Sequence, residues 1–310
     1  MRTRGVLPRR AATALLLATP ALARAQAGGS SDQQARDLAG APASTAPSGR
    51  TNPGDKMTTT HTVPEGGFRF IPGVYQYSAG VAAEPGFALE RVRFAEPVPL
   101  TRGFARIADL LEAAGRPKAA FAACELRSPA PFTEETFAAF NRVYGGVLTE
   151  WGLFREGGLN PVARSNVCPE VAPPPEPSFY AFAYTVRDPT APPSFAIAGS
   201  AEAPEGKADY HDYIIAPGDT SADGLRTKAR WVLGEMERRM GLLGAGWANT
   251  TAAQAYTVRD IHPFFAEELL VARGVARNGL TWQFCRPPVV GLDYEMDCRG
   301  VWRERVLPVG

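Results

Sequence analysis

An arginine and two acidic residues, far apart in the sequence, carry the side chains best suited to chemistry. Arg164 shares strand parity with Asn166, and its planar guanidinium can bind a carboxylate through two charge-assisted hydrogen bonds. Glu295 and Asp297 share one face of an alternating strand, where a carboxyl group can act as a general acid or base. The alternative is structural, with Arg164 paired to a neighbouring acid and both acids solvated or salt-bridged. The residue types therefore indicate either a small-carboxylate site or a set of ion pairs.

Several other chemistries have no pattern in this sequence. There is no Ser-His-Asp arrangement, no phosphate-binding loop and no dinucleotide-binding fingerprint. The four cysteines, Cys124, Cys168, Cys285 and Cys298, show neither a CxxC spacing nor a matching histidine pair, so we expect no metal site. His211 lies between acids in a long loop, where it is either exposed or a pH-tuned proton carrier.

The charge and composition of the chain are those of an ordinary globular protein. Its 310 residues include 33 Lys and Arg against 32 Asp and Glu, a formal charge of +1. Nucleic-acid binders depend on clustered positive charge, so we expect no nucleic-acid partner. No segment after the signal-like N-terminus could span a bilayer, so we expect no membrane partner. The length allows two domains of about 100 to 150 residues.

The N-terminus allows two interpretations. Residues 1–27 combine an arginine-rich start, the apolar run Ala11 to Ala23 and Ala25-Gln26-Ala27, which are the three parts of a secretory signal peptide for a periplasmic or secreted protein. Residues 28–63 follow, and their scarcity of large apolar side chains predicts disorder. In the rival interpretation Met57 is the true start, and residues 1–56 result from translating upstream nucleotide sequence in the same reading frame. We favour this second interpretation, and with it a cytoplasmic protein.

The folded part shows the same order of elements twice. Leu126-Arg127 precedes a turn and helix at Pro131-Phe132, and Val258-Arg259 stands in the same relation to Pro263-Phe264. Apolar residues at helical spacing come before each of these turns, and sequence typical of β-strands follows the second helix of each half. We therefore expect an α+β fold of two units, each a mixed sheet packed against two helices. The predicted units are residues 64–190 and 191–310.

Two short motifs in the first unit resemble the reactive intermediate deaminase (RidA) family. They are Asn141-Arg-Val-Tyr144 and Pro161-Val-Ala-Arg164-Ser165, and an apolar strand ending at Val186-Arg187 follows them. Members of that family hydrolyse enamines and imines, have a chorismate-mutase-like fold and assemble as trimers with sites between subunits. The resemblance covers about residues 70–187 well and residues 195–301 only in layout. It implies two tandem chorismate-mutase-like (RidA-like) units in one chain and a trimer-like homo-oligomer.

The resemblance also implies roles for individual residues. The carboxylate clamp corresponds to Arg164, and the surrounding substrate-binding residues correspond to Asn141, Tyr144, Ser165 and Asn166. The family's acidic position falls in the first unit at Phe182, which cannot move a proton, and in the second unit at Asp297, with Glu295 beside it. We therefore predict a division of labour, in which one unit supplies Arg164 and the other supplies Asp297 or Glu295 as general acid or base. The alternative is that the second unit is only a structural partner.

These inferences predict an enzyme that hydrolyses the carbon–nitrogen bond of a small enamine or imine carboxylate and releases ammonia. A protonated imine is already electrophilic, so a positioned water and a polarising neighbour suffice, with no metal or organic cofactor. Two alternatives stay open. One is a chorismatase-like hydrolase, suggested by Cys285-Arg286 and the acidic strand Asp293 to Asp297. The other is a non-catalytic module that binds small carboxylates or assembles.

Overall fold

Two β-sheets carry the fold, which we describe from a computed structural model that places residues 59–207 and 210–308. The strands of the first half are β1 (His61–Val63), β2 (Phe68–Ile71), β3 (Gly80–Ala83), β4 (Phe87–Pro99), β5 (Phe121–Arg127), β6 (Ala163–Pro169) and β7 (Ser178–Arg187). The strands of the second half are β8 (Phe195–Ala201), β9 (Ala252–Tyr256), β10 (Thr281–Gln283), β11 (Cys285–Arg286), β12 (Glu295–Gly300) and β13 (Arg303–Leu307). The helices are α2 (Leu100–Ala113), α3 (Glu134–Glu150), α4 (Ala222–Leu242) and α5 (His262–Phe265), with short 3-10 turns and the π-helical segment Ala266–Val271.

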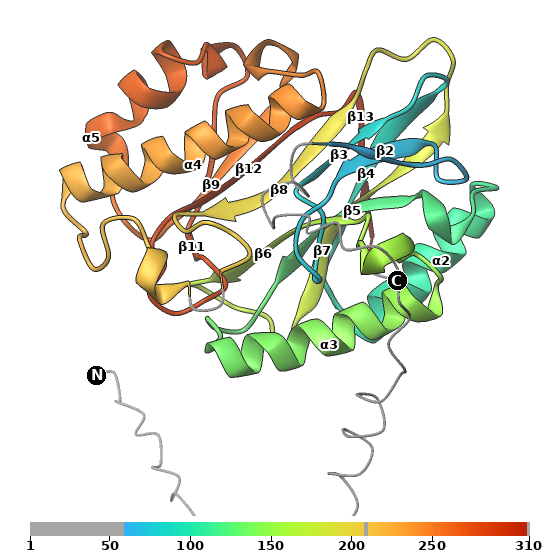
Figure 1. Ribbon diagram of the computed structural model, residues 1–310, viewed down its shortest axis with the longest axis horizontal. Helices are drawn as coiled ribbons and strands as arrows, with labels where there is room; N and C mark the ends of the chain where they lie inside the picture. Colours follow the sequence, from blue (N-terminus) through green and yellow to red (C-terminus); the bar gives the residue numbers. More distant parts are fainter. Residues whose placement is uncertain (1–58, 208–209, 309–310) are drawn as a thin grey trace, which may run out of the picture. The chain divides into compact units, whose positions relative to one another are not determined.

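Both sheets are mixed. The seven-stranded sheet has the order β1-β2-β3-β8-β12-β9-β10, and the six-stranded sheet has the order β11-β6-β5-β7-β4-β13 (Figure 1). The two sheets approach each other closely where β8 meets β6, and a Cβ added to Gly199 there would lie 3.2 Å from the Cα of Ser165. Only a residue without a side chain allows this approach, because any Cβ there would press on the facing backbone.

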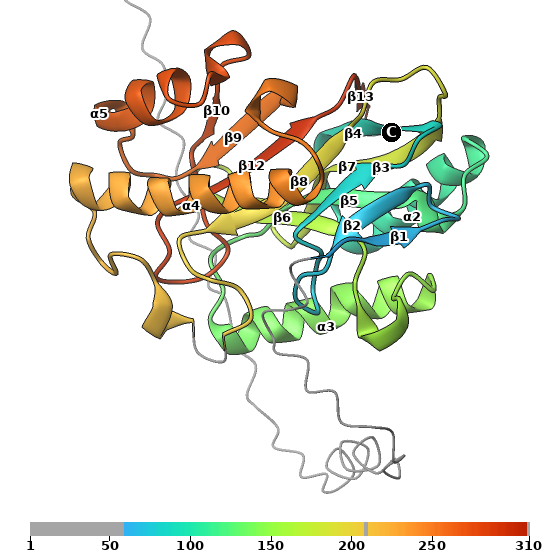
Figure 2. The ribbon, with the colours of Figure 1, turned by 45° about the horizontal axis from the view of Figure 1, so that its top comes forward.

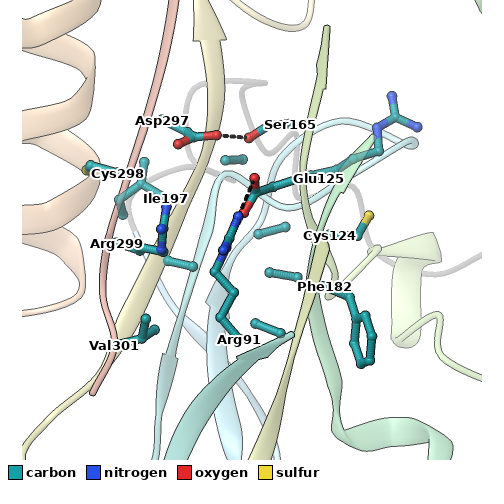
Figure 3. Close-up of a pocket in the computed structure, with 16 residues that line it drawn as sticks. Arg91, Cys124, Glu125, Ser165, Phe182, Ile197, Asp297, Cys298, Arg299 and Val301 are labelled. Carbon is teal, nitrogen blue, oxygen red and sulfur yellow. Dashed lines mark hydrogen bonds and ion pairs between the residues drawn. The ribbon is translucent and has the colours of Figure 1, made fainter. Parts of the chain in front are cut away.

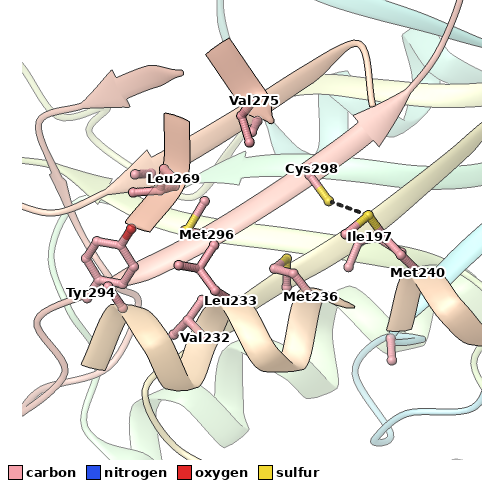
Figure 4. Packing of buried hydrophobic residues seen from close by; sticks show 14 of the residues in the cluster. Ile197, Val232, Leu233, Met236, Met240, Leu269, Val275, Tyr294, Met296 and Cys298 are labelled. Carbon is pink, nitrogen blue, oxygen red and sulfur yellow. Dashed lines mark hydrogen bonds between the residues drawn. The ribbon is translucent and has the colours of Figure 1, made fainter. Parts of the chain in front are cut away.

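Alternation along the strands separates an apolar outer face from a polar inner face. In β12, Met296 and Cys298 pack outward against α4, where the Cys298 Sγ lies 3.8 Å from the Met240 Sδ (Figure 4). The intervening residue Asp297 points inward and is hydrogen-bonded to Ser165 of the other sheet. Helices α4 and α5 thus cover the outer face of the seven-stranded sheet, and α2 and α3 cover that of the six-stranded sheet.

The sequence encodes the start of helix α3, which packs on the six-stranded sheet. Thr133 precedes it in an extended conformation, and its side chain accepts a hydrogen bond from the backbone N–H of Thr136. Glu134 and Glu135 follow in the first turn, where the helix dipole favours negative charge. The buried face of α3 then places Asn141 and Tyr144 over β6.

The expectation of two tandem chorismate-mutase-like units, each with its own sheet and two helices, is wrong. Strands β1 to β3 of the first half complete the sheet of the second half, because β3 pairs with β8 at Gly80↔Ile197 (Figure 2). In return, β13 pairs in parallel with β4 at Arg303↔Glu90, and β11 pairs with β6. The second half also has one long helix, α4, followed by the four-residue α5 and a π-helical segment. Strand pairing over long sequence distances leaves no trace in local periodicity, so the sequence pattern does not show which strands share a sheet.

The N-terminal predictions fall mostly outside the described residues. This holds for the signal peptide of residues 1–27 and for residues 28–58 of the segment predicted to be disordered. The end of that segment, His61–Val63, forms β1 and pairs antiparallel with β2. Within the part of the chain that the structure describes, no helix combines the length and apolar character needed to cross a membrane.

Candidate active site

Arg164 of β6 lies under α3 with an incomplete set of partners. The side chain is buried, and its Nη2 donates a hydrogen bond of 2.9 Å to the Asn141 Oδ1. Its Nη1 is buried without a hydrogen-bond partner, and among the described residues no acid forms an ion pair with it. The guanidinium is instead enclosed by aromatic rings, with the Tyr144 ring centroid 4.8 Å and the Tyr77 ring centroid 5.4 Å away. A buried cation without an anion is costly, which indicates that the anion is a ligand.

A cavity of about 460 Å³ adjoins the Arg164 guanidinium. Side chains from both sheets line it, together with residues 203–207 of the connection that follows β8. One of these side chains is Asn166, whose Oδ1 accepts a hydrogen bond from Ser128 while its Nδ2 is buried without a partner. Arg164 and Asn166 therefore offer two unused N–H donors to the same space, which suits a carboxylate.

Glu295 of β12 lines the same cavity from the opposite sheet. Only 3% of its surface is exposed, and burial, followed by the charges of Asp297 and Glu202, raises its pKa well above the ordinary value, against the opposing charges of Arg127 and Arg164. The carboxyl group therefore holds its proton to a higher pH than an exposed glutamate. Gly199 makes room for it, because a Cβ at that position would overlap the Glu295 Oε1.

Asp297 and Ser165 lie in a second, much smaller cavity between the sheets (Figure 3). The Asp297 Oδ2 accepts hydrogen bonds of 2.6 Å from the Ser165 hydroxyl and 2.7 Å from the Tyr256 hydroxyl, and its Oδ1 accepts one of 3.0 Å from Gln254. Burial and the charge of Glu125 raise the pKa of Asp297, while the hydrogen bonds from Ser165 and Tyr256 and the charge of Arg299 oppose the rise. With a volume of about 30 Å³, this space holds a water at most.

An ion pair completes the interior of this small cavity. Arg91 of β4 donates to both carboxylate oxygens of Glu125, from Nε at 2.6 Å and from Nη2 at 2.9 Å (Figure 3). Burial alone would raise the pKa of Glu125, but the charge and hydrogen bonds of Arg91 bring it down to about 2. The pair joins β4 to β5 within the six-stranded sheet, and neither residue lines the larger cavity.

The predicted site residues therefore separate into two groups. Arg164, Asn166 and Glu295 line the larger cavity, while Asn141 and Tyr144 hold the Arg164 guanidinium from α3. Ser165 and Asp297 are hydrogen-bonded to each other away from that cavity. The roles assigned to all seven residues stay predictions.

Among the residues of the larger cavity that sequence reasoning missed are Tyr77 and Glu205. Tyr77 lies between β2 and β3, and its hydroxyl donates a hydrogen bond of 2.8 Å to the Glu205 Oε1. The signal that could have found Glu205 is the length of the segment after β8, because long connections without periodicity often carry binding residues. Among the described residues, no cluster of three His, Cys, Asp or Glu side chains is arranged to hold a metal ion.

Comparison with known proteins assigns the chain to a class. A family model described as 2-aminomuconate deaminase CnbZ matches residues 60–305, so the chain belongs to this family of deaminases. A 2-amino-5-chloromuconate deaminase from Comamonas testosteroni is 51% identical over 244 residues, covering 78% of this chain and 96% of that protein. Among solved structures, a chorismatase matches with a TM-score of 0.40 and 13% identity over 72% of this chain and 77% of that chain, a likeness too low to define the fold.

These findings correct the resemblance to the reactive intermediate deaminases. The family is CnbZ, and its model spans both sheets, whereas the motifs around Asn141 and Arg164 cover only α3 and β6. The coarser expectation is confirmed, since the chain belongs to a family of enzymes that act on a carbon–nitrogen bond of a small carboxylate. This family favours a deaminase over both alternatives, the chorismatase-like hydrolase and the non-catalytic module. The trimer-like homo-oligomer and the cytoplasmic location stay predictions.

Proposed function

We propose that the protein hydrolyses 2-aminomuconate, or a closely related aminodienedioate, and releases its nitrogen as ammonia. The observation that carries this proposal is the buried Arg164 guanidinium, whose Nη1 has no partner where it adjoins a cavity that also holds the Glu295 carboxyl. Membership of the CnbZ family and the 51% identical chloromuconate deaminase support the substrate class.

The cavity suits a planar dicarboxylate. One carboxylate binds to Arg164 Nη1 and Asn166 Nδ2, the two unused donors. Lys207 lines the same cavity and offers a second positive charge to the far carboxylate. The rings of Tyr77 and Phe137, which also line it, provide apolar surface for the conjugated carbons between the two carboxylates.

The proposed reaction begins with protonation of carbon. An enamine is nucleophilic at the carbon next to its nitrogen-bearing carbon, so Glu295 donates its proton there and converts the enamine into an iminium ion. Water then adds to the nitrogen-bearing carbon, and the resulting carbinolamine collapses to a 2-oxo acid and ammonia. One water is consumed and one ammonia is released, and every step uses groups of the chain itself.

Glu295→Gln tests this function. We expect the wild-type protein to release one ammonia per 2-oxo acid from 2-aminomuconate, and the variant to lose about 10²- to 10⁴-fold in kcat, because an amide cannot supply the proton. Wild-type activity should fall as the pH rises through the raised pKa of Glu295, and the variant should lack that decline. Ammonia and 2-oxo acid are measured together at each pH.

The matched control is Glu176→Gln, which removes the charge of an exposed acid outside the cavity and should leave the rate unchanged. Two results would count against the proposal. One is absence of ammonia release by the wild-type protein, and the other is a Glu295→Gln variant with wild-type kcat.

Gly199→Ala gives a second check on the position of the Glu295 carboxyl. The added methyl group overlaps the Glu295 Oε1 and presses on the backbone of Ser165, so the carboxyl must move away from its place in the cavity. We expect kcat for ammonia release to fall at least about tenfold, since small displacements of a catalytic group have large effects on rate. Gly234→Ala in α4 is the control, because its Cβ would meet nothing within 4 Å. Equal kcat values for the two variants would contradict this account.

A further inference from the structure

Glu205 is held beside the substrate cavity by two donors that use only one of its oxygens. Its Oε1 accepts hydrogen bonds of 2.8 Å from the Tyr77 hydroxyl and 2.8 Å from the Arg239 Nη2. Its Oε2 is buried without a hydrogen-bond partner, and the residue lines the cavity that Arg164 and Glu295 line. The unused oxygen is therefore an unpaired acceptor on a residue that lines the cavity, and the unpaired groups of Arg164 and Asn166, which line it too, are donors.

The two donors also fix the orientation of Glu205. Arg239 is completely buried in α4 and pairs with Glu205 and with Glu235, whose Oε1 accepts from its Nε at 2.8 Å. Burial, followed by the charge of Glu205, raises the pKa of Tyr77 well above its ordinary value, so the phenol keeps its proton and donates it. These two donors hold one oxygen of the Glu205 carboxyl group in place beside the cavity.

Tyr77 sets the spacing between Glu205 and the carboxylate clamp. The carbon of the Arg164 guanidinium lies 5.4 Å from the centroid of the Tyr77 ring, and the hydroxyl at the far end of that ring contacts Glu205. One phenol ring therefore separates the two groups. In a 2-amino acid the nitrogen-bearing carbon is bonded directly to the carboxylate carbon. Binding of that carboxylate at Arg164 thus places the nitrogen-bearing carbon in the cavity that Glu205 also lines.

We infer that Glu205 is the catalytic base that activates the hydrolytic water, while Glu295 is the acid that protonates carbon. This inference rests on the proposed function and assigns a further residue to it. The two carboxyl groups differ in environment, since Glu205 is paired with Arg239 and Glu295 is buried beside other acids. Such a division is the usual basis for separate acid and base roles in one site.

The proton balance closes without any other reactant. Glu295 gives its proton to the enamine carbon, and Glu205 takes a proton from water as the oxygen bonds to the iminium carbon. Glu205 then passes that proton to the amino nitrogen of the carbinolamine. The carbon–nitrogen bond breaks with its electron pair leaving on ammonia, the hydroxyl proton returns to Glu295, and a ketone remains. Both carboxyl groups end in the states in which they began.

Glu205→Gln separates the two proton transfers. The amide oxygen can still accept from Tyr77 and Arg239, but the amide cannot take a proton from water. We expect ammonia release from 2-aminomuconate to fall about 100-fold, while the enzyme-dependent uptake of solvent deuterium at the enamine carbon stays within about threefold of wild type. The Kd for cis,cis-muconate, a dicarboxylate probe without the amino group, should also stay within about threefold. Asp212→Asn, an exposed acid in the same connection, is the control and should match wild type.

Three results would overturn the inference. They are a fall in ammonia release smaller than tenfold, an equal loss of ammonia release and deuterium uptake, and a loss of muconate binding. If Glu205→Gln fails to fold, Glu205→Asp is judged by the same criteria, because it keeps the charge opposite Arg239 and shortens only the reach toward the substrate. Failure of the proposed function itself looks different, because the wild-type protein then releases no ammonia.

Discussion

Arg164→Gln should lower kcat/KM for 2-aminomuconate by about 10-fold to 150-fold. The guanidinium has an unused Nη1 beside the cavity, and a charge-assisted hydrogen bond to a carboxylate contributes about 1.5 to 3 kcal/mol. Because the second donor to this carboxylate is Asn166, the variant loses one such bond, which corresponds to about 10-fold to 150-fold in rate. Glutamine keeps an acceptor and a donor next to Asn141 but has neither the charge nor the fork. Steady-state kinetics of ammonia release measure the effect.

The stability of the same variant distinguishes a binding residue from a structural one. Because Arg164 has no acidic partner among the described residues, its removal leaves no carboxylate unpaired. We therefore expect the melting temperature of Arg164→Gln to equal or exceed that of wild type in the absence of substrate. Arg164→Lys keeps the charge without the planar fork and should be intermediate in rate. A glutamine variant within about threefold of wild-type kcat/KM, or one that is strongly destabilised, would remove Arg164 from the binding site.

Arg91→Met should destabilise the protein by about 3 to 5 kcal/mol, the largest effect on stability that we expect from one substitution. Both partners of the Arg91–Glu125 pair are nearly inaccessible, with side-chain exposures of 7% and 12%. Methionine fills part of the space but leaves the Glu125 carboxylate buried without its two nearest donors. Urea denaturation at neutral pH measures the difference, and the double variant Arg91→Met/Glu125→Met should recover much of it.

The difference in free energy of unfolding between wild type and Arg91→Met should depend on pH. In the wild-type protein Glu125 has a pKa of about 2, below its ordinary value, so the pair contributes stability at neutral pH and loses it as the pH falls toward 2. Without Arg91, burial raises the pKa of Glu125, and the variant should then gain stability relative to wild type as the pH is lowered. A free energy of unfolding that differs from wild type by the same amount at every pH would show that the pair is not responsible.

The sequence predicts those parts of the site that depend on local periodicity. Asn141 and Tyr144 lie on one face of a regular helix, so their common position above Arg164 follows from helical spacing. Parity also places Glu295 and Asp297 on one face of β12. Parity cannot show that they serve different cavities, because residues two apart in a strand are separated by about 6.5 Å along its axis.

The rest of the site and the fold depend on contacts that no local pattern carries. Tyr77 and Glu205 lie in irregular connections, and only the tertiary structure brings the Tyr77 hydroxyl into contact with the Glu205 carboxyl group. The exchange of strands between the sheets likewise depends on pairing such as Gly80↔Ile197, over more than a hundred residues of sequence. Local pattern therefore predicts single helices and strands, but it does not show which strands share a sheet.

The place of β13 has a consequence for synthesis. This strand, Arg303–Leu307, forms the edge of the six-stranded sheet beside β4, although β4 belongs to the first third of the chain's length. On a ribosome β13 emerges long after β4, so the flank of β4 that β13 covers has no neighbour during that interval. During this interval the nascent protein exposes the unpaired hydrogen-bonding edge of β4. Chaperones or a second nascent chain can bind to that edge before β13 pairs with it.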